Sequence, residues 1–386
     1  MIVEPKVKGF ICTTAHPVGC KENVRRQIEY IKSLGENNGP KKVLVIGAST
    51  GYGLATRIAA AFGSHADTLG VMFDKEASGK RTGTPGYYNT KAFEEFAHEE
   101  GLYAKSINGD AFSRELKQEV IQTIQEDLGQ VDMVVYSLAA PRRMMADGTV
   151  YNSVLKTTGE VFTQKSLDLK DNTIHEVSVE PATEEEIEAT VKVMGGEDWF
   201  DWMNALNEAG VLADQCITVA YSYIGPELTY PIYYNGTIGA AKKDLHAYAE
   251  KIDQKFGSTG VKAYISVNKG LVTQASSAIP VVPLYFAMLY KVMKKKGIHE
   301  GCIEQIGRLF KDKLFGGQVL TDENGMIRMD DYEMREDVQE EIKNAWTNVT
   351  TENVMEVADI DGYWEDFYQM FGFRIDGVDY SADVEV

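Results

Sequence analysis

Short apolar runs alternate with helical repeats between residues 40 and 275. Runs of this kind are typical of buried parallel strands, which are apolar on both faces. The predicted strands are Lys42–Ile46, Thr68–Phe73, Val131–Leu138, Ile217–Ala220 and Val261–Val267. Apolar residues recur at helical spacing from Leu116 to Leu128 and from Leu245 to Phe256, which predicts helices between the strands. The alternation predicts an α/β fold built on a Rossmann-like, doubly wound parallel sheet.

Three segments fall outside this alternation. Residues 1–40 form an N-terminal segment with a helix expected over Lys21–Leu34, residues 141–200 form a polar, turn-rich insertion, and residues 297–386 form an acidic, mostly helical tail. The sequence has no internal repeat and no low-complexity linker. We therefore predict one large domain over residues 1–386, with a core at about 40–275 and these three elaborations.

A glycine-rich loop follows the first predicted strand and precedes a helical segment. Its sequence is Gly47-Ala48-Ser49-Thr50-Gly51-Tyr52-Gly53. Glycines at such a turn let the backbone approach a pyrophosphate, and the helix that follows points its free N–H groups at the same anion. The spacing is G-x-x-x-G-x-G and differs from the familiar G-x-G-x-x-G, and a tight strand-to-helix turn also needs glycine. The position between a strand and a helix favours a dinucleotide site, and a glycine turn without a ligand is the alternative.

Asp74 stands at the end of the second predicted strand, 21 positions after Gly53. An acidic residue about 20 positions beyond the loop bonds the adenosine ribose hydroxyls in dinucleotide-binding folds. A carboxylate there repels a 2′-phosphate, so the sequence favours NADH over NADPH. The neighbouring Lys75 weakens that preference, and a solvated turn aspartate is the alternative.

Tyrosines crowd the segment that follows the fourth predicted strand, with five between residues 221 and 234. Two tyrosine–lysine pairs share one spacing, Tyr233 with Lys242 and Tyr234 with Lys243. Such a pair can stabilise a developing oxyanion and hold a cofactor ribose. Nine steps along one helix would leave the two side chains on opposite faces. Because Asn235-Gly236 is a turn signal, we expect the tyrosine before the helix and the lysine inside it. Spacing alone does not decide which pair would be active. It also allows a tyrosine-rich core segment with surface lysines and no active pair.

Charge and composition exclude several classes of protein. Lys+Arg 39 against Asp+Glu 58 gives a net charge of −19, which disfavours nucleic acid and anionic membranes as partners. The four cysteines and six histidines show no metal-ligand or disulfide spacing. The longest apolar stretch, Ala278–Tyr290, has 13 residues and two prolines, too short to span a bilayer. With no signal peptide at the N-terminus, we expect a cytoplasmic protein without a metal.

Several blocks in order give the chain a family likeness. It resembles the trans-2-enoyl-CoA reductase family, which includes the FabV-type enoyl-acyl-carrier-protein reductases and belongs with enlarged relatives of the short-chain dehydrogenases that carry a Tyr-x8-Lys site. The resemblance covers nearly the whole chain. Its blocks are His16–Cys20, Gly47–Gly53, Asn108–Phe112, Tyr136–Ala139, Val193–Trp199, Tyr221–Gly225, Val267–Thr273 and Gly301–Ile306.

The resemblance implies roles for individual residues. The family's catalytic tyrosine lies three residues before the glycine that starts the helix, here Gly236, which selects Tyr233 and Lys242 and leaves Tyr234 and Lys243 as bystanders. It implies a substrate contact for Tyr223. It implies cofactor contacts for the loop, for Lys242 and for Phe73, Asp74, Asp110, Ala111, Leu138, Ala139, Leu271, Val272 and Thr273. The implied function in fatty-acid metabolism is NADH-dependent reduction of the C2=C3 bond of trans-2-enoyl thioesters, carried on CoA or acyl carrier protein, by a monomer.

Two other functions remain as alternatives, and one apolar and one basic segment each allow two interpretations. A carbonyl reductase or alcohol dehydrogenase of the short-chain superfamily would place tyrosine and lysine at Tyr-x3-Lys, a spacing that this segment lacks, and a non-catalytic NAD sensor would not need the pair. The apolar Ile279–Leu289 stretch is either a wall of the acyl pocket or a plain buried helix. Four lysines could meet CoA phosphates, although an exposed helix end is the safer interpretation: Lys291, Lys294, Lys295 and Lys296.

Overall fold

The computed structural model describes residues 1–8, 11–273, 276 and 279–386. Within them, a parallel sheet of seven strands forms the centre of the molecule, in the order β13-β12-β11-β6-β3-β4-β5. The order runs in both directions from β3, as in a doubly wound fold, so the predicted fold class is confirmed. The strands are β3 (Lys42–Ile46), β4 (Asp67–Met72), β5 (Ala104–Asn108), β6 (Val131–Tyr136), β11 (Leu212–Ser222), β12 (Lys262–Val267) and β13 (Met326–Arg328).

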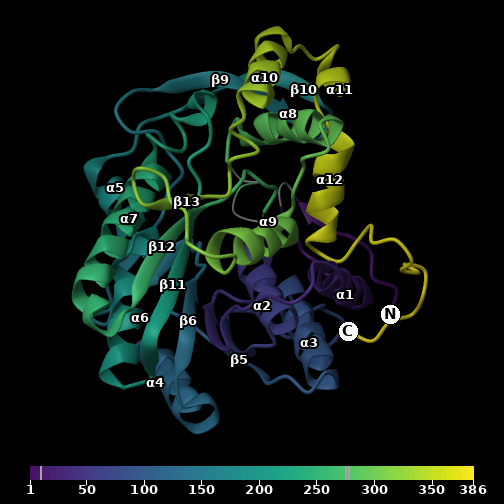
Figure 1. Cartoon of the computed structure of the whole chain (residues 1–386). Helices are drawn as coiled ribbons and strands as arrows, with labels where there is room; N and C mark the ends of the chain where they lie inside the picture. Colours follow the sequence, from purple (N-terminus) through teal and green to yellow (C-terminus); the bar gives the residue numbers. More distant parts are fainter. Residues whose placement is uncertain (9–10, 274–275, 277–278) are drawn as a thin grey trace.

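Alternate residues of the central strands pack against different sets of helices. Val43 and Val45 of β3 belong to a core with α1 (Pro17–Ser33), α2 (Gly51–Ser64), α3 (Pro85–Glu99) and α9 (Cys302–Arg308). Leu44 and Ile46 face the opposite core, with α4 (Arg114–Thr123), α6 (Glu197–Glu208) and α7 (Thr237–Phe256). Successive side chains of a strand point to opposite faces, so an unbroken apolar run must be covered on both. Figure 1 shows the two helix groups on either side of the sheet.

The insertion and the tail build a third apolar core, beyond the end of the sheet. The insertion contributes the antiparallel hairpin β9 (Phe162–Asp168) and β10 (Thr173–Val179). The tail contributes α10 (Glu336–Asn348), α11 (Val354–Val357) and α12 (Ile360–Gln369), which pack with the almost fully buried α8 (Val282–Lys295). In Figure 1, α8, α10 and α11 lie together at the top, and α12 runs down from them towards α1. Tyr52 and Cys302 touch both this core and the core around α2. A single domain over the whole chain stays a prediction.

Short elements complete the described chain. The strands β1 (Val7–Lys8) and β2 (Ile11–Cys12) form a small hairpin, as do β7 (Arg142–Met144) and β8 (Val150–Asn152), and α5 (Glu184–Met194) contacts α7. Two π-helical turns extend α4 and α9, over Ile124–Leu128 and Leu309–Leu314, and 3₁₀ turns span Glu227–Thr229 and Gly257–Thr259.

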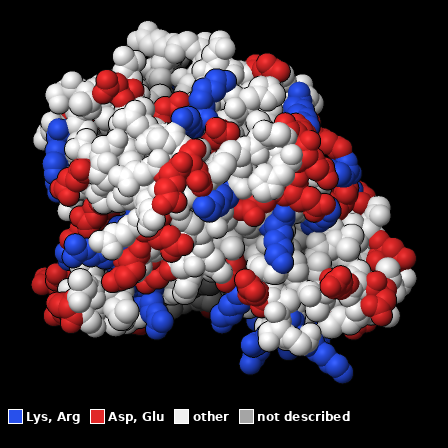
Figure 2. Space-filling model, turned by 90° about the horizontal axis from the view of Figure 1, so that it is seen from below, with Lys and Arg blue, Asp and Glu red and all other residues white. Residues whose placement is uncertain are grey.

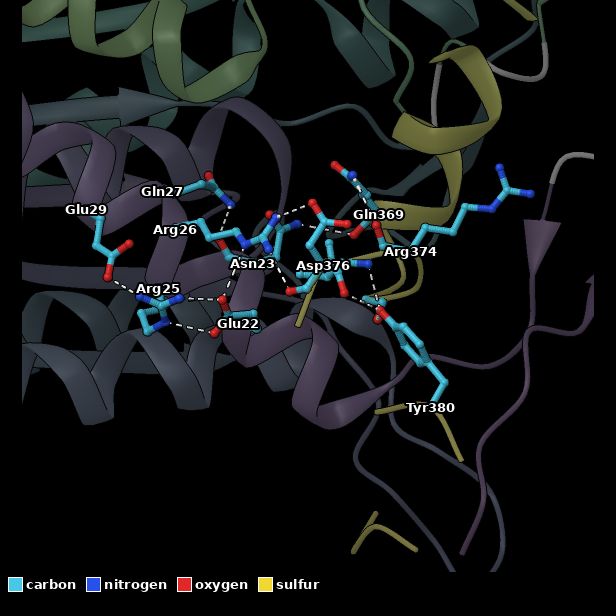
Figure 3. Close-up of polar contacts among 12 residues, drawn as sticks. Glu22, Asn23, Arg25, Arg26, Gln27, Glu29, Gln369, Arg374, Asp376 and Tyr380 are labelled. Carbon is cyan, nitrogen blue, oxygen red and sulfur yellow. Dashed lines mark hydrogen bonds and ion pairs between the residues drawn. The ribbon is translucent and has the colours of Figure 1, made fainter. Parts of the chain in front are cut away.

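The first long helix holds the end of the chain. The backbone of α1 approaches the turn after α12 so closely that a Cβ on Gly19 would lie 1.7 Å from the Gly372 carbonyl oxygen. One helical turn further, Asn23 donates to the Gln369 carbonyl oxygen at 3.2 Å, and about two turns further the Arg26 Nη2 group donates to the Asp376 carbonyl oxygen at 2.6 Å (Figure 3). The two termini consequently lie near each other (Figure 1).

The surface mixes both signs of charge. Figure 2 shows acidic and basic side chains interspersed over the face that it draws. Among the described residues, no helix combines the length and apolar character needed to cross a bilayer. The same part of the chain holds no cluster of three or more His, Cys, Asp or Glu side chains that could bind a metal ion.

Candidate active site

The glycine loop is packed so tightly that side chains would not fit at two of its positions. Gly47 has φ +86°, and a Cβ there would lie 2.0 Å from the Ser137 carbonyl oxygen. A Cβ on Gly53 would lie 1.8 Å from the Gly47 carbonyl oxygen. Thr50, at the N-cap of α2, makes no side-chain cap bond, so the first N–H groups of the helix remain available to an anion. The loop therefore has the backbone approach and the helix end that a pyrophosphate requires.

Asp74 lies just beyond the carboxyl end of β4. Its Oδ1 accepts a hydrogen bond from the Thr84 hydroxyl at 2.7 Å, while Oδ2 is buried and has no partner among the described residues. The side chain of Asn108 holds the Asp74 backbone through both its amide groups, at 2.8 and 2.9 Å. Phe73, next to it, leaves 82% of its surface exposed. A buried acceptor without a donor is suited to a ribose hydroxyl, and an exposed ring beside it to an adenine.

The other residues that the resemblance links to the cofactor follow neighbouring strands. Asp110 and Ala111 come after β5, where the Asp110 carboxylate accepts from the Phe112 amide at 3.0 Å and the Trp202 indole donates to the Ala111 carbonyl at 3.1 Å. Leu138 and Ala139 come after β6, and Leu271–Thr273 after β12. Carboxyl ends of parallel strands meet at one edge of the sheet, which is where ligands bind in this architecture.

Two cavities meet at that edge. One, of about 410 Å³, is lined by Thr50 and Gly51 of the glycine loop and by Leu271, Val272 and Thr273. The other, of about 240 Å³, shares Leu271 and Thr273 with it. We call this second space the reaction cavity. It also holds Leu138, Ala139, Tyr52, Tyr223, Tyr233 and Lys242. The fold thus brings residues from positions 50 to 273 onto two cavities that share lining residues.

Tyr233 faces the reaction cavity from the turn before α7. Its N–H donates to the Thr229 carbonyl oxygen at 2.9 Å, and its ring is packed edge-to-face on Tyr223, with centroids 4.7 Å apart. Only 7% of the residue is exposed. Burial raises the pKa of the Tyr233 phenol, chiefly by desolvation and further by the nearby Glu333. The group is therefore a neutral hydrogen-bond donor at physiological pH.

Lys242 lies on the first turns of α7, so the structure confirms a tyrosine before the helix and a lysine within it. Its ammonium group donates to the Tyr221 carbonyl oxygen at 2.8 Å. Desolvation lowers the pKa of Lys242 to about 8. A cation fixed in this way, with donors to spare, is suited to hold ribose hydroxyls beside the phenol.

Tyr234 and Lys243 lie elsewhere. Tyr234 is 37% exposed and is packed against Tyr230, with ring centroids 5.0 Å apart, and the Lys243 ammonium lies 4.4 Å from the Tyr234 ring centroid. Both line a different cavity, of about 340 Å³, which borders the reaction cavity at Tyr223 and Lys242.

The structure shows the surroundings of the two segments whose roles the sequence did not decide, Ile279–Leu289 and the lysines at the end of α8. Ile279 and Phe286 line the reaction cavity, whereas Leu284, Met288 and Leu289 are fully buried in the core, so Ile279–Leu289 is both a wall and a buried helix. Three of the four lysines at the end of α8 pair with carboxylates of the tail. The pairs are Lys294 with Asp359 (2.7 Å), Lys295 with Glu341 (2.7 Å) and Lys296 with Asp337 (3.0 Å).

No signal in the sequence pointed to a titratable group that lies beside this site. Glu333, from the tail, approaches the Tyr223 hydroxyl to 2.9 Å. Its neighbours in sequence, Tyr332 and Met334, form no motif, and nothing local distinguishes it from the many other acidic residues of the tail. Only the fold brings it to residues 110 positions earlier in the chain.

Family models match the chain from end to end. The model for the trans-2-enoyl-CoA reductase catalytic region matches residues 81–315, and that for the NAD(P)H binding domain of trans-2-enoyl-CoA reductase matches residues 2–79. The chain belongs to the trans-2-enoyl-CoA reductase family. The resemblance inferred from the sequence blocks is confirmed.

Individual relatives carry names from both branches of this family. The chain is 57% identical to an enoyl-[acyl-carrier-protein] reductase [NADH] of Vibrio vulnificus, covering 100% of this chain and 97% of the relative. It is 55% identical to a trans-2-enoyl-CoA reductase [NADH] of Ruminiclostridium cellulolyticum, covering 100% and 98%. The solved trans-2-enoyl-CoA reductase of Treponema denticola, in complex with NAD, superposes with a TM-score of 0.96 at 49% identity, covering 100% of this chain and 98% of that one. These relatives are NADH-dependent reductases, in agreement with the expected cofactor and enzyme class.

A third family model, described as an enoyl reductase FAD binding domain, matches residues 321–384. The residues present do not suit a flavin dinucleotide. The cavity within this segment is lined by three carboxylates, Asp361, Glu365 and Asp376, against one guanidinium, Arg374, which would repel a pyrophosphate. The apolar faces of α10 and α12 are already packed on α8. The segment instead lines the cavity at the glycine loop, through Asp366, Gln369 and Met370, and we derive no step through a flavin.

Proposed function

We propose that this protein reduces the C2=C3 double bond of trans-2-enoyl thioesters with NADH. The observation that carries the proposal is the placement of the buried Tyr233 phenol and the Lys242 ammonium on one cavity, which continues to the glycine loop. The names of the relatives, enoyl-acyl-carrier-protein and trans-2-enoyl-CoA reductases with NADH, support it.

The proposed cofactor contacts follow from the unsatisfied groups at the sheet edge. The glycine loop and the N-terminus of α2 would hold the pyrophosphate, and the free Asp74 Oδ2 would accept from an adenosine ribose hydroxyl. Phe73 would cover the adenine. Asp110, Ala111, Leu138, Ala139 and Leu271–Thr273 would line its path, and Lys242 would hold the nicotinamide ribose. When bound, NADH supplies a hydride to C3 of the substrate.

Tyr233 provides the group that the reaction needs most. Negative charge develops on the thioester oxygen as the C2=C3 bond accepts a hydride, and a neutral phenol that donates to this oxygen stabilises the enolate. The high pKa of Tyr233 keeps its proton in place for this purpose. C2 then takes a proton. Tyr223, packed on the Tyr233 ring, is the proposed second contact with the substrate.

The rest of the reaction cavity suits a short acyl chain. Its walls include the apolar side chains of Leu155, Met194, Ile238, Ile279 and Phe286. Apolar walls exclude water, which strengthens every hydrogen bond to the developing oxyanion. The proposal leaves CoA and acyl carrier protein as alternative carriers, because both present the same thioester. We also propose a monomer that works in the cytoplasm, where the four free cysteines stay reduced.

The test is the oxidation of NADH by the purified protein with crotonyl-CoA, followed by absorbance. We expect rapid turnover with crotonyl-CoA and negligible turnover with 3-ketoacyl-CoA or simple aldehydes. A parallel assay with an enoyl thioester on acyl carrier protein compares the two carriers. Faster reduction of the ketone would transfer the chain to the carbonyl reductases.

Cofactor choice gives a separate prediction. Because the free oxygen of Asp74 would repel a 2′-phosphate, turnover should be much faster with NADH than with NADPH. Asp74→Asn should shrink this preference by about 1–3 kcal/mol, the scale of a lost charge-assisted hydrogen bond. The exposed Glu76 offers a matched control, since Glu76→Gln should leave the preference unchanged. Equal rates with both cofactors in the unmodified protein would contradict the role of Asp74.

A further inference from the structure

A carboxyl group from the tail is completely buried behind Tyr223 and Gly270, two residues that line the reaction cavity. Glu333 follows β13 and has 0% of its surface exposed. It is also far in sequence from the other groups of the site. Burying a carboxylate is costly unless its charge is compensated, so the surroundings of this side chain decide which form it takes.

Three hydrogen-bonding groups surround the Glu333 carboxyl. Oε1 lies 2.9 Å from the Tyr223 hydroxyl and 2.7 Å from the Tyr285 hydroxyl, and Oε2 accepts from the Gly270 N–H at 2.7 Å. Gln339 completes the arrangement by donating to the Tyr285 hydroxyl at 3.2 Å and to the Glu333 carbonyl oxygen at 2.6 Å. Every oxygen of the carboxyl group therefore has a defined partner.

No cation neutralises the group at close range. Among the described residues, Glu333 takes part in no ion pair within 4.0 Å. The charged or titratable groups near it are Tyr223 and Tyr233 beside the cavity, Tyr52 on α2, Tyr285 on α8, Lys269 after β12 and Asp330 after β13. Burial raises the pKa of Glu333, and Asp330 raises it further, while Gly270, Lys269 and Tyr285 lower it. Complete burial without a cation within 4.0 Å favours the neutral carboxylic acid over the carboxylate.

The protonation state of Glu333 decides where the Tyr223 proton points. An ionised carboxylate can only accept, so Tyr223 must donate to it and turn its proton away from the cavity. A neutral acid can instead donate from Oε1 to the Tyr223 oxygen, while Oε1 still accepts from Tyr285. The Tyr223 hydroxyl is then free to donate into the reaction cavity, beside Tyr233.

We propose that Glu333 is a positioning residue that acts as a neutral acid, donating to Tyr223 so that the Tyr223 hydroxyl donates to the thioester oxygen. The proposal rests on the proposed function and adds a second donor to the oxyanion. No proton is transferred, since Glu333 keeps its proton and only the direction of the hydrogen bonds is set. An ionised Glu333 would oppose the reaction in two ways. It would accept the Tyr223 hydrogen bond, so that Tyr223 could not donate to the substrate, and it would place a negative charge near the developing enolate.

Glu333→Gln separates the two forms of the group. The Gly270 N–H needs an acceptor, so the amide oxygen faces Gly270 and the amide NH₂ faces the two tyrosine oxygens. The NH₂ donates to Tyr223 as the neutral acid does, although it cannot accept from Tyr285. We expect kcat with crotonyl-CoA to fall only about threefold, within the worth of one neutral hydrogen bond. A loss of 100-fold or more, with an unchanged melting temperature and NADH affinity, would show that the ionised form is needed and would overturn the proposal.

Two further variants distinguish positioning from mere support of the fold. Glu333→Leu offers no donor to Tyr223 and should lower kcat about 10–100-fold. In a Tyr223→Phe background the same substitution should add nothing, because its effect acts through that hydroxyl. Additive losses would assign Glu333 a structural role instead. Glu300→Gln, at another buried glutamate, which pairs with Arg308, is the matched control and should leave kcat unaffected.

The protonation state can be measured without turnover. The infrared spectrum of the unmodified protein at neutral pH should contain a carbonyl stretch from a protonated carboxyl group that disappears in Glu333→Gln and persists in Glu300→Gln. Absence of this band would overturn the proposal, even if a variant of Glu333 is inactive. Failure of the unmodified protein to reduce crotonyl-CoA would instead refute the proposed function, and the infrared result would still report on Glu333.

Discussion

The two tyrosine–lysine pairs are one position apart in the sequence but differ in burial and in the groups that they contact. Tyr233 is 7% exposed and Lys242 bonds the Tyr221 carbonyl, whereas Tyr234 is 37% exposed and Lys243 is exposed over its ring. Both pairs have eight intervening residues. The comparison teaches that equal spacing can define two copies of a motif whose burial differs.

A local turn separates the two tyrosines. The Tyr233 N–H is fixed to the Thr229 carbonyl, which directs its side chain to Tyr223, while the next ring is packed on Tyr230. On α7 the two lysines are about 100° apart around the helix axis, because neighbouring residues of a helix always are. One pair therefore faces the sheet edge and the other faces outwards.

The largest difference should appear in kcat. Tyr233→Phe removes one hydroxyl and little volume, so the fold and NADH affinity should survive while kcat with crotonyl-CoA falls about 10²–10³-fold. Tyr234→Phe, the matched control, should change kcat by less than about threefold. If Tyr234→Phe is the crippled enzyme and Tyr233→Phe is nearly normal, the assignment is wrong by one residue.

The lysines should differ next, in cofactor affinity. Lys242→Met removes the proposed contact with the nicotinamide ribose, and a hydrogen bond to a charged group is worth about 1.5–3 kcal/mol, or about 10- to 150-fold in the Kd for NADH. Turnover should fall with it. Fluorescence titration with NADH measures the effect. Lys243→Met should bind NADH as the unmodified protein does, and a loss of affinity there would abolish the distinction between the pairs.

The nucleotide side of the site could be predicted from the sequence because its signals are local. The glycine loop, the strand before it and Asp74 lie within 33 residues, and each has a pattern that physical chemistry explains. The choice between Tyr233 and Tyr234 needed the family resemblance, since adjacent residues with equal spacing carry no local difference. The roles of all these residues stay predictions until the variants are measured.

The substrate side could not be predicted in the same way. Glu333 meets Gly270 and Tyr285 across 63 and 48 positions, and no periodicity reports such a contact. Two strands of the central sheet were also missed. β5 has the pattern Ala-Lys-Ser-Ile-Asn, polar on one side because it is an edge strand, and β13 has only three residues and lies in the tail taken as mostly helical. Short edge strands lack the continuous apolar run that marks a central strand.

Burial of Lys242 should also make stability depend on pH. Its pKa of about 8 in the folded protein lies below the 10.5 of an exposed lysine, so between these values the unfolded chain binds the extra proton. The free energy of unfolding therefore rises as the pH rises from about 8 to 10.5. Below pH 8 the cost of burying the charged lysine is fully present, and it lowers stability by roughly 1–3 kcal/mol. Urea unfolding at several pH values measures it. Lys242→Met should remove this contribution, whereas Lys243→Met should follow the unmodified protein.

The smallest expected effect concerns the outer pair itself. The Lys243 ammonium lies 4.4 Å from the centroid of the Tyr234 ring, and an exposed cation–π contact of this kind is worth about 0.5–1 kcal/mol. A double-mutant cycle of Tyr234→Leu and Lys243→Met, followed by urea unfolding, should give a coupling energy at the lower end of this range, because water and salt screen both groups. The same variants should keep kcat and NADH affinity nearly unchanged. A coupling energy near zero would show that the contact between Tyr234 and Lys243 does not stabilise the fold. A large loss of kcat in either single variant would show that the outer cavity takes part in the reaction, and that burial does not distinguish an active pair from an inactive one.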